Sequence, residues 1–124
     1  MSIEYSDIQL APIAIVGIGC RFPGNVVDEK SFWNLLSKGM DASSEIPLSR
    51  WDAEQYYDPN PAIIGKMYTK RGSFVENVDQ FDPLFFNISG REAQFMDPQQ
   101  RLLLEVCHEA IEKSGISLQE LKQL

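Results

Sequence analysis

The stretch 96–115, MDPQQRLLLEVCHEAIEKSG, fixes how the rest of the chain can be placed, because it predicts one well-delimited helix. Asp97 is a good N-cap, Pro98 follows at the first helical position, and Gln100 is spaced to complete a capping box. Gly115 is suited to the left-handed conformation that often follows a last helical turn. Apolar side chains recur at three- and four-residue steps and predict a buried face made of Leu103, Val106, Cys107, Ala110 and Ile111.

Upstream of this helix, the stretch 12–19, PIAIVGIG, is apolar at nearly every position. This pattern is typical of a strand covered on both faces in a parallel or mixed sheet. Such a strand needs partners on both edges, since each buried backbone group left unpaired costs about 1–3 kcal/mol. The only other strand signal is weak and lies around Gly72, within 67–75. Gly17 and Gly19 do not open a dinucleotide fingerprint, because Phe22 occupies the position of its third glycine.

Shorter elements are predicted on either side of an irregular, proline-punctuated excursion over residues 40–65. They are a helix that begins after Asp28, ends at Gly39 and buries Phe32, Leu35 and Leu36; a short helix within 53–57; an aromatic cluster of Phe81, Phe85 and Phe86; a helical turn over 91–95; and a final helix over 118–124 capped by Ser117. Residues 1–11 are predicted to be a disordered leader. The fold class is therefore α/β, with one buried strand, several helices and a long irregular excursion.

Composition excludes several classes of protein. The 124 residues suit one domain, and 44% hydrophobic with 23% charged residues is a globular composition. The net charge of −7, with scattered Lys and Arg, argues against nucleic acid as a partner. The longest apolar run is too short to span a bilayer, and no export signal is visible at the N-terminus, so we expect no membrane partner and a soluble, cytoplasmic protein.

Cys20, Cys107 and His108 are the residues that most resemble candidates for catalysis or metal binding. The two cysteines have no short-range spacing, and without export they are expected to be reduced, small apolar side chains. Cys107 and His108 are neighbours on a predicted helix, so they point about 100° apart. That geometry predicts neither a catalytic Cys–His pair nor a metal site.

The blocks that carry a family resemblance follow one another from Pro12 to the C-terminus. They are PIAIVGIGCRFPG (12–24), FWNLLSKGMDASSEIP (32–47), RWD (50–52), YYDPNP (56–61), GKMYTKRGSFVENVDQFDPLFFNIS (65–89), REA (91–93) and MDPQQRLLLEVCHEAIEKSGI (96–116). In this order and spacing, the chain resembles the N-terminal portion of the β-ketoacyl synthase (ketosynthase) domain of type I modular polyketide synthases. The prediction is that residues 12–124 are a truncated N-terminal part of such a domain.

The resemblance implies a thiolase-like fold: two α/β halves with buried five-stranded sheets, assembled as a homodimer. Residues 12–19 would be the first strand of the first half, with the helix 97–114 packed on its sheet. It also implies a decarboxylative condensation, in which an active-site cysteine takes an acyl group and joins it to a malonyl unit on an acyl carrier protein. Two histidines assist that reaction. The carrier protein and the dimer partner are implied only for the complete domain.

The family's catalytic blocks do not occur in these 124 residues. The nucleophilic cysteine belongs to a block like DTACSS, and the histidines belong to a block like HGTGT and to a second later block. By this resemblance Cys20 and Cys107 do not inherit the nucleophile's role, and His108 stands where relatives often carry an aromatic residue. Gly90 stands where proline is common. We expect no catalytic, cofactor-binding or metal-binding residue, no cofactor, and no ketosynthase activity from the chain alone.

Three interpretations of function remain open. The first is a truncated β-ketoacyl synthase of a polyketide or fatty-acid synthase. The second is a non-catalytic interaction module that associates with full-length synthases through open strand edges. The third is an independent acidic, helix-rich domain, which requires a cooperative unfolding transition of the isolated monomer.

Overall fold

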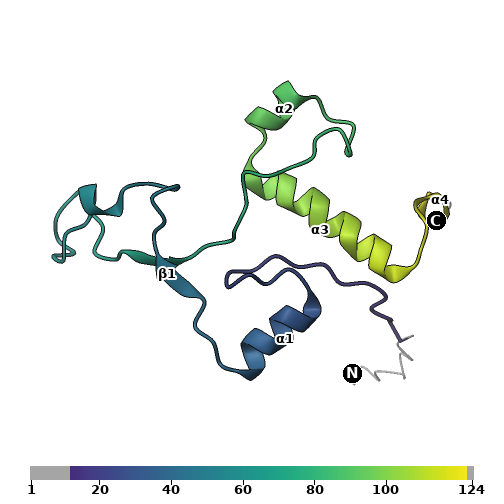
Figure 1. The fold of residues 1–124 in the computed structure, drawn as a ribbon, viewed down its shortest axis with the longest axis horizontal. Coiled ribbons are helices and arrows are strands. Elements are labelled where there is room, and N and C mark those ends of the chain that lie inside the picture. The colour runs from purple at the N-terminus through teal and green to yellow at the C-terminus, as the bar shows by residue number, and fades with distance from the viewer. Residues whose placement is uncertain (1–11, 123–124) are drawn as a thin grey trace, which may run out of the picture.

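The structure, a computed structural model, describes residues 12–122 as a small mixed α/β arrangement around one long helix (Figure 1). The elements are α1 (Glu29–Ser37), β1 (Ser43–Glu45), η1 (Ala53–Gln55), β2 (Arg71–Ser73), α2 (Gly90–Phe95), α3 (Pro98–Ser114) and α4 (Leu118–Leu121). Figure 1 shows α3 near the middle, α1 to one side of it, and β1 with β2 on an arm, residues 40–75, that extends away from α3. The predicted leader, residues 1–11, lies outside the described residues.

The predicted long helix is confirmed as α3. The carboxylate of Asp97 accepts a hydrogen bond of 2.8 Å from the backbone N–H of Gln99, so the cap is formed with this residue and not with Gln100. Pro98 occupies the first helical position, and Gly115 ends the helix with φ of 71°. These signals are all local to the chain, which is why the sequence alone locates both ends of the helix.

The N-terminal segment, residues 12–19, is extended but is not a strand, so the prediction of one buried strand is wrong for this chain. No backbone–backbone hydrogen bond within residues 12–122 involves this segment. Ile13 and Ile15 are 95% and 82% exposed. The apolar pattern indicates burial, but a strand also needs neighbours that complete its hydrogen-bond ladder, and the described part of the chain supplies none.

One face of the N-terminal segment lies directly against the backbone of α3 (Figure 1). A Cβ added at Gly17 would overlap the carbonyl oxygen of Ala110, and a Cβ added at Gly19 would overlap that of Val106. Two extended residues advance about 6.6 Å, and the four helical residues from Ala110 back to Val106 span about 6.0 Å. The two glycines therefore meet helix carbonyls one turn apart, and the contact has a single register.

The shorter helices begin at capping residues, of which Asp28 and Ser117 are predicted from the sequence. At α1, the carboxylate of Asp28 accepts from the backbone N–H of Ser31 at 2.7 Å, and the Ser31 hydroxyl accepts from the backbone N–H of Asp28 at 3.1 Å. Ser89 and Ser117 accept from the first turns of α2 and α4. The face of α1 that is predicted to be buried stays partly open, with Leu36 52% exposed.

The arm carries the two strands. β1 and β2 pair antiparallel in the register Ser43–Ser73, Ser44–Gly72 and Glu45–Arg71. The prediction of short strands around Gly72 is confirmed by β2. The partner β1 is not predicted from sequence, because Ser-Ser-Glu has neither apolar residues nor alternation. The helix predicted within 53–57 is confirmed as the 3₁₀ turn η1.

Little of the chain is buried. Within residues 12–122, the buried apolar side chains are Cys20, Val26 and Ala93, at 7%, 1% and 9% exposure. The accessible surface is 10605 Å² for a mass of 14.1 kDa. A compact protein of this mass exposes roughly 6,700 Å², so the elements are arranged in space without enclosing a core of ordinary size.

Candidate functional site

Cys20 and Cys107, the two candidate thiols, lie in different surroundings. Cys20 is buried, and Cys107 is exposed on α3; both are free cysteines. The backbone carbonyl of Cys20 accepts a hydrogen bond of 2.9 Å from the guanidinium of Arg21, which holds the main chain here. Within the described part of the chain, neither thiol has a hydrogen-bond partner that would polarise it.

His108 packs among aromatic rings and does not pair with Cys107. Its ring centroid lies 4.8 Å from that of Phe85 and 6.2 Å from that of Phe86, both edge to face. Its Nε2 lies 3.4 Å from a carboxylate oxygen of Glu112, one turn further along α3. The predicted aromatic cluster is thus confirmed, and the imidazole of His108 packs against two of its rings. This is the packing role expected for His108.

The described residues, 12–122, contain no group of three or more His, Cys, Asp or Glu side chains placed to hold a metal ion. The same part of the chain contains no helix with both the length and the apolar character needed to cross a bilayer.

Arg21 and Glu109 form the main polar link between the N-terminal part and α3, and no spacing or motif in the sequence signals it. The guanidinium makes two hydrogen bonds to the Glu109 carboxylate and a further one of 3.1 Å to the carbonyl of Val27. The two side chains are 22% and 31% exposed. The hydrogen bond to Glu109 raises the pKa of Arg21. Because the Glu109 carboxylate compensates its charge, Arg21 has a structural role and is not available to bind an anionic ligand.

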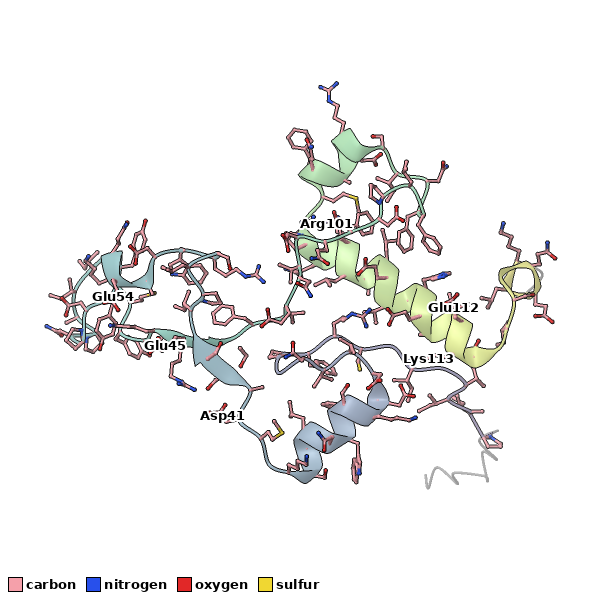
Figure 2. All side chains as sticks on the ribbon, viewed as in Figure 1. Asp41, Glu45, Glu54, Arg101, Glu112 and Lys113 are labelled. Carbon is pink, nitrogen blue, oxygen red and sulfur yellow. The ribbon has the colours of Figure 1, made fainter. Side chains whose placement is uncertain are left out.

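A second, exposed ion pair joins α1 to the end of α3. The ammonium of Lys113, labelled in Figure 2, donates to the carboxylate of Glu29 at 2.9 Å. This hydrogen bond lowers the pKa of Glu29 and raises the pKa of Lys113. Both α1 and the N-terminal part are therefore fastened to the same helix by carboxylate–cation pairs.

Two apolar surfaces remain open. One is on the N-terminal segment, where Ile13, Ile15, Val16 and Ile18 are 50% to 95% exposed. The other is a groove of about 530 Å³ whose lining includes Met96, Leu103, Leu104 and Cys107. Leu103 and Cys107 are predicted from sequence to be buried, but both are exposed, which corrects that prediction. The face of α3 that contacts the rest of the described chain is therefore narrower than the apolar stripe predicted for this helix.

Comparison with sequence families and curated proteins gives one consistent result. Residues 10–124 match the family described as Beta-ketoacyl synthase, N-terminal domain. The chain is 57% identical over 105 residues to a component of the phenolphthiocerol/phthiocerol polyketide synthase of Mycobacterium tuberculosis, covering 85% of this chain and 6% of that protein. It is 52% identical over 107 residues to the Spectinabilin polyketide synthase system protein NorC of Streptomyces orinoci, covering 86% and 5%. The chain thus spans about 6% of the length of the first of these relatives.

Among solved structures, the oxazolomycin ketosynthase domain OzmH KS7 of Streptomyces albus JA3453 has the same fold over the shared part. The TM-score is 0.82 at 39% identity, and the match covers 88% of this chain and 19% of that one. The arrangement around α3 is therefore that of the corresponding part of a larger domain. The chain belongs to the β-ketoacyl synthase family, as an N-terminal fragment of the ketosynthase domain of a type I modular polyketide synthase.

Proposed function

We propose that this chain supplies N-terminal scaffold to a ketosynthase domain and carries out no condensation by itself. In the complete family member, acyl and malonyl units are joined on an acyl carrier protein by decarboxylative condensation. The observation that carries the proposal is the separation of the reactive groups: Cys20 is buried, Cys107 is exposed on α3, and His108 packs against Phe85 and Phe86. Acyl transfer needs a nucleophile beside an acid–base group and an oxyanion site.

Within the complete thiolase-like domain, the N-terminal segment acts as a central strand and α3 packs on its sheet. The near-continuous apolar character of residues 12–19 supports this role, because parallel strands with both faces covered have that composition. The exposed fractions of Ile13 and Ile15, 95% and 82%, are the part of that surface which the other strands and helices of the domain would cover. Carrier-protein binding and dimer formation then belong to the assembled domain.

A grafted domain tests the scaffold role. Residues 12–122 of this chain replace the matching N-terminal part of the OzmH KS7 domain, and the chimaera is incubated with an acyl thioester donor. The expected result is a folded chimaera that forms an acyl-enzyme, detected by mass spectrometry. A chimaera that misfolds or takes no acyl group, beside a parent domain that does, would contradict the proposal.

The isolated 124-residue chain is the matched comparison under the same conditions. We expect no acyl adduct on it, because within residues 12–122 neither thiol has a hydrogen-bond partner that would activate it. An acyl thioester on Cys20 or Cys107 of the isolated chain would show that the chain accepts acyl groups by itself. That result would overturn the statement that it is inactive alone. Cys20→Ser and Cys107→Ser variants identify which thiol reacted.

A second candidate function is that of a non-catalytic module that associates with full-length synthases. The N-terminal segment favours it, because within residues 12–122 its backbone N–H and C=O groups make no backbone–backbone hydrogen bond, and edges of this kind recruit further strands. The test is retention of an intact ketosynthase domain on the immobilised chain. If the immobilised chain retains no ketosynthase domain, the interaction-module interpretation is ruled out, and the scaffold role is unaffected.

A further inference from the structure

We draw no further inference here: the strongest candidate, the apolar groove of about 530 Å³ between α2 and α3 whose lining includes Met96, Leu103 and Cys107, carries none, because the chain covers 19% of the OzmH KS7 domain and nothing within the described residues shows what covers this surface.

Discussion

At the scale of single residues, the contact between Gly17 and the Ala110 carbonyl leaves no room for a methyl group. Gly17→Ala is expected to destabilise the grafted domain by about 1–3 kcal/mol, because either the segment must move off α3 or the helix backbone must shift. The measurement is urea unfolding of the chimaera with and without the substitution. A parallel change, Gly19→Ala, should act in the same direction through the Val106 carbonyl.

Gly90 supplies the matched control for these two substitutions. A Cβ there would meet no other atom within 4 Å, and the residue is the first of α2. Gly90→Ala should therefore be neutral, or stabilising by less than about 1 kcal/mol through the lower entropy of the unfolded chain. Equal destabilisation at positions 17 and 90 would mean that glycine flexibility, and not the contact with α3, explains the first result.

At the scale of elements, the attachment of α1 to α3 is predicted to depend on pH. Hydrogen bonding to Lys113 lowers the pKa of Glu29 below its ordinary value of 4.5, so the ionised form is favoured in the folded chain. The stabilisation is complete above that ordinary value and is lost as the pH falls through the lowered one. An NMR titration of the Glu29 carboxyl should give a midpoint that returns toward 4.5 in the variant Lys113→Gln.

The control for this titration is Lys38→Gln, because Lys38 follows the opposite end of α1. It removes the same charge without removing the hydrogen bond to Glu29. A Glu29 midpoint that moves equally in both variants would show that general charge, and not the specific pair, controls the carboxyl. Because both groups of the pair are exposed, added salt should reduce the effect in the wild-type chain.

How far each element can be predicted from sequence follows from where its determinants lie. The prediction of α3 is close because Asp97, Pro98 and Gly115 act within the helix itself. The prediction of a buried strand for the N-terminal segment is wrong, since apolar composition indicates burial but not the partner that completes a sheet. The strand β1 escapes prediction because its three polar residues pair with a segment 28 positions away, and nothing in their local sequence indicates it.

Some features of the candidate site can likewise be predicted from the sequence, and others cannot. The separation of Cys107 from His108 follows from helix geometry alone, and the packing of His108 on Phe85 agrees with it. The Arg21–Glu109 link cannot be predicted, because the two residues lie 88 positions apart and each is an ordinary charged residue in its own surroundings. Long-range polar pairs of this kind are specified by the fold and leave no spacing in the sequence.

At the scale of the whole molecule, the accessible surface of 10605 Å² is roughly one and a half times that of a compact protein of this mass. Apolar burial is the main favourable term in folding, and here it is too small to give a cooperative unit. The isolated chain should therefore unfold over a broad temperature range. The measurement is thermal circular dichroism in the near and far ultraviolet, with the size of the species checked by chromatography.

A sharp transition, coincident at both wavelength ranges and shown by a defined monomer, would contradict this prediction and favour the independent-domain interpretation. The grafted domain provides the comparison, because the same residues are then covered by the rest of the structure. We expect a single cooperative transition there, with the helical signal of α3 lost together with that of the other elements.

The register between the N-terminal segment and α3 also restricts how a gene for this part of the domain can change length. A codon inserted or deleted between Gly17 and Gly19 would bring a residue other than glycine against one of the two helix carbonyls, and the residues beyond it would turn to the opposite side of the chain. Compensation would require a simultaneous change within α3. The arm, residues 40–75, has no such partner in α3, so insertions and deletions among homologous genes should gather there and spare residues 12–19.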